Sequence, residues 1–391
     1  MKELIYYDER ALSPIGGPAG YLFNLKREIE KHSNKDIDFI CSYNTNLDAL
    51  YLLKAYFNRL FNRFTYDDRR IRYLKHMVWK SRNNGTVDFS DYDIVHFHGT
   101  LELYTEKKQL ETYKGIVVLT SHSPKVFYKE NIEDSLSTEQ YKKNRYFCDE
   151  LQEVDKYAFK RADVLIFPCE TAEEPYYHSW DLYQKYRCGK DVRYIPTGIM
   201  EQTFQKNRNQ VRKELGISED AYVISFVGRH NEVKGYDLLI ELYTKIDDAY
   251  FVCCGKKGRI KCPEDKRWIE IGWTEDPYSY VNASDLFILP NRETYFDLSL
   301  LQTISIGKTA LISNTGGNKY FKGREDAGIF VFDNIEDACK IIKYLKSRET
   351  IEEESKHMKE LYSNYFTNEM FYQKYIKTMM DIYEDHRKNG E

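Results

Sequence analysis

Short hydrophobic runs recur along the chain, separated by segments long enough to form helices. The first series comprises Leu4–Tyr7, Ile37–Cys41, Ile94–Phe97, Ile116–Leu119 and Val164–Phe167. The second series comprises Tyr222–Val227, Tyr250–Cys254, Trp268–Ile271, Leu286–Leu289, Thr309–Ile312 and Ile329–Phe332. Runs that are largely apolar on both faces are typical of buried parallel strands. Because helices alternate with these strands, the sequence predicts an α/β protein of two doubly wound, Rossmann-like domains.

A Pro/Gly turn, Ile195-Pro196-Thr197-Gly198, falls between the two series and marks the expected domain boundary. We expect an N-terminal domain over residues 1–195 and a C-terminal domain over residues 196–365, and a chain of 391 residues can bury two such cores. From about Thr350, charged and aromatic residues alternate at helical spacing. This pattern predicts amphipathic helices there, including a C-terminal helix over residues 366–391.

Composition narrows the class of protein. The 58 Lys and Arg nearly balance the 62 Asp and Glu, giving a net charge of -4, so a nucleic-acid partner is not expected. The 8 cysteines include no CxxC pair, which favours a reducing, cytoplasmic compartment. The charged N-terminus does not resemble a signal peptide, and no apolar run reaches the ~18 residues of a membrane span. Any membrane contact is therefore expected to be peripheral.

Aromatic residues are abundant, with 34 Tyr, 21 Phe and 4 Trp, and some of them interleave with Lys and Arg over residues 58–82. In that segment Asp67 and Asp68 are the only acidic residues. Basic, aromatic helices can lie on an anionic membrane surface at the inner face of the membrane. The alternative is a solvated helical hairpin that packs its aromatic side chains inward.

Several polar or glycine-rich segments follow predicted strands, where open α/β sheets bind their ligands. Gly16 and Gly17 lie between the first strand and a helix, so backbone N–H groups could approach an anion there, although a plain tight turn has the same composition. His96 and His98 alternate onto one face of a strand, with His98 at its carboxyl end, and His122 follows the next strand. Structural histidines would fit the same positions. Metal binding is less favoured, because no carboxylate or thiol stands at ligand spacing.

The second series carries a stronger pattern. Arg229 and Lys234 occupy one strand-to-helix loop with glycines on either side, which suits a diphosphate better than a merely solvated loop. Further along, Pro290–Gln302 follows a strand directly, and a helix is expected to begin near Asp297. The first turn of that helix would offer free backbone N–H groups and the positive end of a dipole.

Taken in order, these segments resemble the family 4 glycosyltransferases of the GT-B fold over nearly the whole chain. The shared motifs are the glycine loop at Gly16 and Gly17, DIVHFHG, TSHSP, ADVLIFP, YIPTG, FVGR with KG, and SDLFILPN. The resemblance implies two Rossmann-like domains facing each other across a cleft, with the donor on the C-terminal domain and the C-terminal helix packing back toward the N-terminal one. It also implies a nucleotide-sugar substrate, with no cofactor and no divalent metal.

The resemblance assigns roles residue by residue. Arg229 and Lys234 match the residues that bind the donor diphosphate, and His122 matches a histidine beside the transferred sugar. His98 is expected to contact the sugar or to position the acceptor. The glycine loop at Gly16 and Gly17 would close over the sugar, and a later turn, Thr315–Lys319, would touch it.

One departure concerns the pair of glutamates that flank a Phe-Gly-Leu segment in the family. Here the segment reads Phe296-Asp297-Leu298. Gln302 takes the place of the glutamate that holds the nucleotide ribose, Thr294 takes the place of the other, and Glu293 is one residue out of register. We expect Gln302 to accept a ribose hydrogen bond through its carbonyl oxygen, without the charge of a carboxylate. Asp297 is expected to cap the helix, leaving the N–H of Leu298 to face the donor.

The resulting hypothesis is a retaining glycosyltransferase that moves a sugar from a nucleotide diphosphate sugar of the UDP class to a hydroxyl acceptor. The acceptor would be a glycan, a lipid-linked intermediate or a protein, in glycoconjugate or cell-surface polysaccharide synthesis. Two alternatives remain open: a non-catalytic GT-B subunit that serves as partner or chaperone of another transferase, and a nucleotide-sugar epimerase on the same scaffold.

Overall fold

The computed structural model describes residues 1–7, 12, 14, 17–41, 66–83, 88–133, 136–348 and 352–390. The chain divides into two compact units. Unit 1 comprises Met1–Phe167, Tyr176–Ile195 and Tyr372–Glu391, and unit 2 comprises Pro168–Pro175 and Pro196–Phe371. The segment Pro168–Pro175 thus groups with unit 2, although the strand series places it in the first domain.

Unit 1 is built on a six-stranded parallel sheet in the order β2-β1-β3-β4-β5-β6. Its strands are β1 (Glu3–Tyr7), β2 (Ile37–Cys41), β3 (Ile94–Phe97), β4 (Ile116–Leu119), β5 (Val164–Phe167) and β6 (Asp191–Tyr194). The first five coincide with the predicted hydrophobic runs. The edge strand β6 was not predicted, because its sequence is half polar and its residues are only partly buried.

Helices cover this sheet. Before residue 196 they are α1 (Gly17–Lys31), α3 (Tyr66–Asn83), α4 (Thr100–Thr105), α5 (Lys107–Leu110), α6 (Thr138–Lys143), α7 (Arg145–Glu150), α8 (Gln152–Arg161), α9 (Glu174–Ser179) and α10 (Tyr183–Arg187). The C-terminal helix α17 (Asn368–Gly390) belongs to unit 1 from Tyr372 onward. Its Tyr375 is fully buried and hydrogen-bonds to Glu3 in β1 and to His96 in β3, so this part of α17 is fixed to the sheet.

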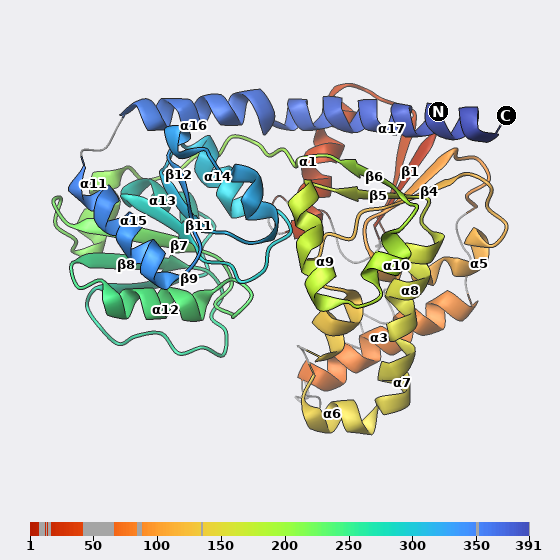
Figure 1. Ribbon diagram of the computed structural model, residues 1–391, viewed down its shortest axis with the longest axis horizontal. Helices are drawn as coiled ribbons and strands as arrows, with labels where there is room; N and C mark the ends of the chain where they lie inside the picture. The colour runs from red at the N-terminus through yellow and green to blue at the C-terminus, as the bar shows by residue number, and fades with distance from the viewer. Residues whose placement is uncertain are drawn as a thin grey trace. The chain divides into compact units, whose positions relative to one another are not determined.

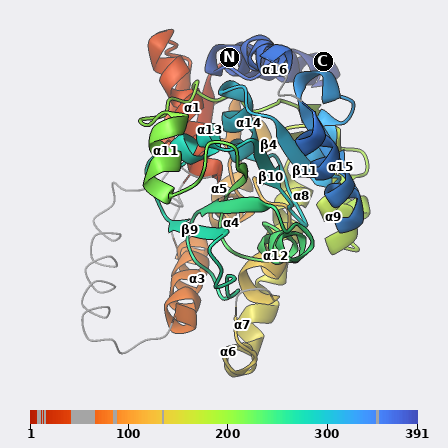
Figure 2. The same ribbon diagram turned by 90° about the vertical axis from the view of Figure 1, so that its left-hand side faces the viewer.

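The helix α3 contains the described part of the basic, aromatic segment, whose residues 58–65 lie outside the described residues. Ile71, Leu74 and Val78 are buried at helical spacing and pack into a cluster with residues of α4, α7 and α8. Arg72 and Lys75 are exposed on the same helix. In Figure 2, α3, α6 and α7 extend from the same side of the unit. These three aliphatic residues of α3 thus face the protein, whereas the aromatic Trp79 is 47% exposed and Tyr73 is only partly buried.

Unit 2 is built on a second six-stranded parallel sheet in the order β12-β11-β10-β7-β8-β9. Its strands are β7 (Tyr222–Val227), β8 (Ala249–Cys254), β9 (Trp268–Gly272), β10 (Leu286–Leu289), β11 (Ala310–Ser313) and β12 (Ile329–Phe332). Together with the sheet of unit 1, this topology confirms the predicted α/β class with two Rossmann-like sheets.

The helices of unit 2 lie on both faces of its sheet. They are α11 (Arg208–Leu215), α12 (Tyr236–Lys245), α13 (Pro277–Ala283), α14 (Leu298–Ser305), α15 (Ile335–Ser347) and α16 (Glu352–Tyr365). Leu239 and Leu242 of α12 share the larger core with Ile335 and Ile342 of α15. Figure 1 shows α12 below the sheet and α13 above it. The sheet is therefore covered on both sides, which leaves its ends for ligands.

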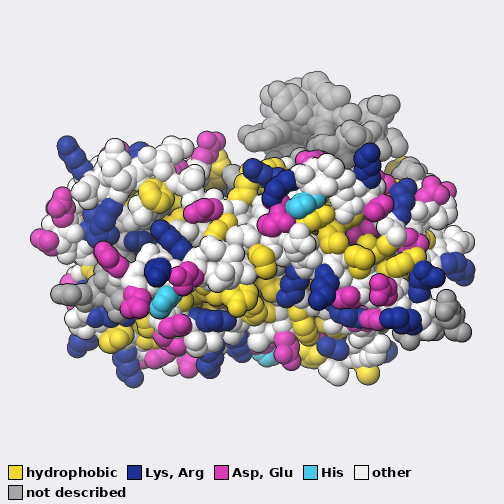
Figure 3. Space-filling model, turned by 90° about the horizontal axis from the view of Figure 1, so that it is seen from above, with side chains coloured by type: hydrophobic (Ala, Val, Ile, Leu, Met, Phe, Trp, Pro, Cys, Tyr) yellow, Lys and Arg dark blue, Asp and Glu magenta, His cyan; other side chains and the backbone are white. Residues whose placement is uncertain are grey.

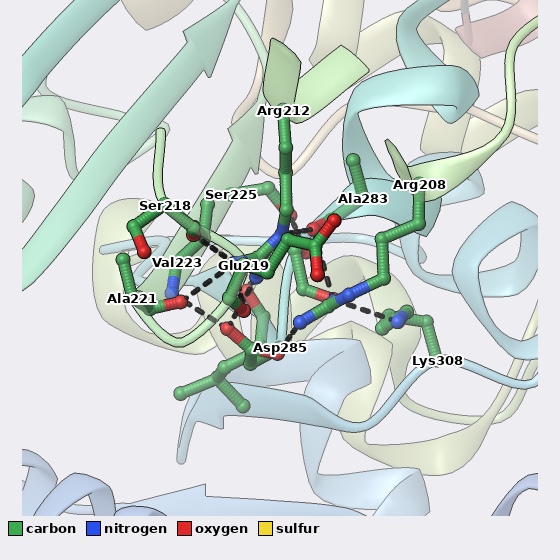
Figure 4. A network of polar contacts seen from close by, with 12 residues as sticks. Arg208, Arg212, Ser218, Glu219, Ala221, Val223, Ser225, Ala283, Asp285 and Lys308 are labelled. Atoms are coloured by element: carbon green, nitrogen blue, oxygen red, sulfur yellow. Dashed lines mark hydrogen bonds and ion pairs between the residues drawn. The ribbon is translucent and has the colours of Figure 1, made fainter. Parts of the chain in front are cut away.

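The amino ends of β7 and β10 are held by a buried polar network (Figure 4). The Asp285 carboxylate accepts hydrogen bonds from the backbone N–H of Val223 at 2.7 Å and from the guanidinium groups of Arg212 at 2.8 Å and Arg208 at 2.6 Å. Arg212 is 1% exposed, and every one of its guanidinium nitrogens donates a hydrogen bond. Removing one partner of such a buried pair is strongly destabilising. This end of the sheet is thus structural, and the loops at the carboxyl ends are the candidates for function.

The surface carries charges of both signs. On the face shown in Figure 3, Lys and Arg side chains are interspersed with Asp and Glu. Among the described residues, no helix has both the length and the apolar character needed to cross a membrane.

Candidate functional site

At the carboxyl edge of the unit 2 sheet, the loop after β7 is pressed against the segment after β10. Gly235 has φ 65°, and a Cβ at this position would collide with the carbonyl oxygen of Pro290. Only glycine therefore allows this close approach. The backbone N–H of Lys234 donates to Asn231 Oδ1 at 3.0 Å, which fixes the turn that carries Lys234. As a result, Lys234 faces the start of α14.

Asp297 is the centre of this contact. Its Oδ1 accepts hydrogen bonds from the backbone N–H and the hydroxyl of Ser299 at 3.1 and 2.8 Å, so it caps α14 as the sequence predicts. Its Oδ2 accepts from Asn291 Nδ2 at 2.9 Å and from the Lys234 ammonium. Burial by itself would raise the pKa of Asp297, but Lys234 and the hydrogen bonds from Asn291 and Ser299 outweigh it and lower the pKa to about 2. Lys234 and Asp297 therefore form an ion pair.

Arg229 is exposed on the same loop, next to the buried His230. The His230 side chain is 2% exposed, stacks on Tyr236 with ring centroids 4.1 Å apart, and lies 3.4 Å from Glu270. The backbone N–H of His230 also donates to the carbonyl oxygen of Lys256 at 3.1 Å. Arg229 thus projects from a fixed point, with its guanidinium accessible to an anion.

The segment that carries the altered glutamate motif packs against residues Gly316–Phe321. Thr294 is buried, and its carbonyl oxygen accepts a hydrogen bond from Gly317 N at 3.1 Å, within the predicted Thr315–Lys319 turn. Phe296 packs on Phe321, with ring centroids 5.7 Å apart. Glu293 is half-buried, and Leu298 is the partly exposed first residue of α14. Thr294 and Phe296 therefore support the segment, whereas Leu298 lies on its accessible side.

Gln302 is engaged in a way that the sequence does not reveal. Its Oε1 accepts a hydrogen bond from the hydroxyl group of Tyr278, which is 5% exposed and lies on α13. The carbonyl oxygen that we expected to accept from a ribose thus already accepts one hydrogen bond and keeps one further lone pair. The amide N–H groups of Gln302 remain as donors. Tyr278 had no signal in the sequence beyond its place after a helix-starting Asp-Pro pair.

In unit 1, the structure brings the two predicted histidines together. His98 Nδ1 lies 2.8 Å from His122 Nε2, and the two rings are stacked with centroids 5.1 Å apart. His122 follows β4 with φ 56°, a left-handed conformation that is uncommon for a residue with a side chain. His96 is 4.0 Å from His98 between ring centroids, but its own nitrogens contact Tyr375 and Thr120, so it is structural.

Burial keeps these imidazoles neutral. It lowers the pKa of His98 well below its ordinary value, and the neighbouring His96 and His122 act in the same direction. Burial and His96 lower the pKa of His122 to about 3. Among the described residues, His98 Nε2 has no hydrogen-bond partner. Two neutral imidazoles can hydrogen-bond to hydroxyl groups, but they carry no charge with which to bind a phosphate.

Only part of the predicted glycine loop is among the residues that the structure describes. Gly16 is not among the described residues, and Gly17 is the exposed first residue of α1. Tyr21, one turn further along α1, contacts both histidines, with ring centroids 4.7 Å from His122 and 5.6 Å from His98. The start of α1 is thus adjacent to the histidine pair.

Known proteins resemble the chain in sequence and in fold. Residues 207–362 match the family described as glycosyl transferases group 1. The O-antigen biosynthesis glycosyltransferase WclY of Escherichia coli is 26% identical over 118 residues, which are 28% of this chain and 33% of that protein. The aligned region therefore spans about a third of that relative's length.

Among solved structures, a sucrose-phosphate synthase from Thermosynechococcus elongatus has a TM-score of 0.66 at 13% identity, covering 98% of this chain and 100% of that one. HepE from Anabaena, solved with UDP and glucose, has a TM-score of 0.60 at 14% identity, covering 97% of this chain and 99% of that one. These similarities show the fold. The chain therefore has the GT-B fold, and its residues 207–362 match the group 1 glycosyltransferase family.

Proposed function

We propose that this protein transfers a sugar, with retention of configuration, from a UDP-type nucleotide diphosphate sugar to a hydroxyl acceptor. The observation that carries the proposal is the placement of Arg229 and Lys234 on one loop, which Gly235 holds against Pro290 and from which Lys234 contacts the N-cap residue of α14. Two features of related proteins support it: WclY acts in O-antigen biosynthesis, and HepE was solved with UDP and glucose. We accordingly propose a role in the synthesis of a cell-surface polysaccharide or glycoconjugate.

In the proposed reaction, the bond between the sugar and the diphosphate breaks and negative charge develops on the leaving group. Arg229 and Lys234 stabilise that charge from fixed positions, which is the electrostatic contribution that such a reaction most needs. Two cations can fulfil this role without a divalent metal, and we propose that the reaction uses neither a metal nor a cofactor. The amide N–H of Gln302 would hydrogen-bond to the nucleotide ribose, while Glu293 and the Leu298 backbone N–H would line the donor site.

His122 and His98 are proposed to bind hydroxyl groups of the sugar or of the acceptor. Their neutral rings suit this role, because a charged imidazolium would favour an anion over a hydroxyl group. The glycine loop at Gly16 and Gly17 would contact the same sugar.

The test is to incubate the purified protein with a panel of nucleotide sugars, with and without candidate acceptors, and to follow both the nucleotide and the sugar. The proposal predicts slow release of UDP without acceptor and a new glycoside with one. A new epimer of the donor in the absence of acceptor would identify an epimerase instead. Nucleotide binding with no turnover of any donor would favour the non-catalytic subunit.

We also propose that the protein binds peripherally to an anionic membrane surface on the cytoplasmic side, where a lipid-linked acceptor would be found. The support comes from α3. Arg72 and Lys75 are exposed on it, and Trp79 is 47% exposed, although Ile71, Leu74 and Val78 of this helix are buried. Exposed cations and an amphipathic ring are the groups that bind an anionic interface.

A further inference from the structure

The Asp297 carboxylate stands where the proposed function places the donor diphosphate. We infer that Asp297 is an internal anion that competes with the diphosphate for Lys234 and for the first turn of α14. The consequence is that the site binds nucleotide diphosphates weakly and releases them readily. This inference rests on the proposed function, and it concerns the affinity of the site rather than the identity of its ligand.

The first observation is that Lys234 is already paired. Its ammonium donates to Asp297 Oδ2, and the Asp297 side chain is only 7% exposed. A charge pair in a partly dehydrated setting interacts much more strongly than the same pair in water. The Lys234 side chain is 24% exposed, so a phosphate can still reach the ammonium, which has further N–H donors to offer. The phosphate must then share Lys234 with a carboxylate.

The second observation is that the α14 N-terminus is already capped. The Ser299 backbone N–H donates to Asp297 Oδ1 at 3.1 Å, and the N–H groups of Leu300 and Leu301 point to the Asp297 carbonyl oxygen. A helix N-terminus attracts anions through its free N–H groups and its dipole. Here the protein's own carboxylate occupies that place, and the family motif that this segment resembles has glycine instead.

The third observation is that the carboxylate is fully held. Besides Lys234 and Ser299, Asn291 donates to it at 2.9 Å, so both of its oxygens are satisfied. It therefore stays ionised and in place when an anionic ligand approaches, and like-charge repulsion between carboxylate and phosphate weakens binding. A diphosphate gains less here than it would from an unpaired lysine and an uncapped helix.

Three possible roles for Asp297 predict different changes in UDP affinity when the charge of its side chain is removed. If Asp297 competes with the ligand, removing its charge strengthens UDP binding. If Asp297 serves to position Lys234 for the ligand, removing the charge weakens UDP binding. If Asp297 is a helix cap alone, Asp297→Asn leaves UDP affinity unchanged, because asparagine also caps helices through its side-chain oxygen.

The experiment is calorimetric titration of UDP into the full chain and into Asp297→Asn, Lys234→Met and the double variant. We expect Asp297→Asn to bind UDP about tenfold or more tightly than the wild type, which is the range of one charged hydrogen bond. When Lys234→Met is already present, adding Asp297→Asn should increase UDP affinity much less, because the lysine for which both anions compete is gone. Asp265→Asn, an exposed acidic residue before β9, is the matched control and should bind UDP like the wild type.

The outcomes distinguish a failure of the competition by Asp297 from a failure of the proposed diphosphate site. Equal or weaker UDP binding by Asp297→Asn, with wild-type binding that still depends on Lys234, would overturn the competition and leave the proposed function standing. Absence of UDP binding by all the proteins, or wild-type binding indifferent to Lys234, would overturn the diphosphate assignment and the competition together. Thermal unfolding without ligand checks that each variant is folded.

Discussion

For the histidine pair, the sequence predicts the location of the residues but not their protonation state. Because His98 and His122 follow two successive predicted strands, the sequence predicts that both lie at the carboxyl edge of one sheet, and the structure places His98 Nδ1 2.8 Å from His122 Nε2. Their neutrality could not be predicted, because it depends on burial and on His96. That third imidazole hydrogen-bonds to Tyr375, which is 279 residues distant in the chain. Likewise, Gln302 is a visible departure in the sequence, but its contact with Tyr278 appears only when α13 and α14 pack together.

A pH dependence follows for His122. Its pKa is about 3 in the folded protein against an ordinary value of 6.5, so below about pH 6.5 the unfolded chain binds a proton that the folded chain does not. The free energy of unfolding should therefore fall as the pH drops from 6.5 toward 3. We expect His122→Asn to reduce this slope by up to about 1 kcal/mol per pH unit.

Urea unfolding of the wild type and His122→Asn between pH 7 and pH 4 measures this effect. The control is His178→Asn, which removes an exposed histidine from α9 and should leave the slope as it is. Parallel pH profiles for the wild type and His122→Asn would show that His122 is not held neutral by the fold.

At the scale of elements, the hydrophobic runs located five strands of unit 1 and all six of unit 2 to within a residue or two, because strands buried on both faces leave a continuous apolar signal. The edge strand β6 was not predicted, because the charged residues Asp191 and Arg193 interrupt its hydrophobic pattern. In the structure these two side chains form an ion pair at 2.6 Å. The sequence shows a glycine at position 235 in a strand-to-helix loop, but its close approach to Pro290 depends on how the two loops pack in the folded protein.

The helix α3 carries a prediction of its own. If its exposed cations bind anionic lipid, Arg72→Gln/Lys75→Gln should reduce recovery of the protein with phosphatidylserine vesicles in a flotation assay. About 1 kcal/mol per cation near the surface corresponds to a loss of about tenfold or more for the pair. The buried stripe of Ile71, Leu74 and Val78 is untouched, so the fold should persist.

The matched control is Lys340→Gln/Lys343→Gln, which neutralises two exposed cations on α15 of unit 2. Equal recovery of the wild type and the α3 variant, or equal losses for both variants, would remove α3 as the membrane-binding element.

At the scale of the whole molecule, the chain forms two units whose sheets share one architecture and differ in the chemistry at their carboxyl ends. Unit 1 presents neutral imidazoles, and unit 2 presents Arg229 together with the Lys234 and Asp297 pair. The strand series predicts two domains, but it could not show that Pro168–Pro175 groups with unit 2, because that membership depends on tertiary contacts. This division of chemistry is what the proposed transfer requires: hydroxyl recognition on one unit and diphosphate stabilisation on the other.

Arg229 is proposed to stabilise the diphosphate leaving group, and this role is tested by measuring sugar transfer from the preferred nucleotide sugar by the wild type and by Arg229→Ala. Lys343→Ala serves as a surface control, and thermal unfolding verifies the fold. We expect Arg229→Ala to lower kcat/KM about a hundredfold or more, the usual cost of losing one group that stabilises developing charge, while its unfolding temperature stays unchanged. Full transfer activity in a folded Arg229→Ala protein would contradict this role.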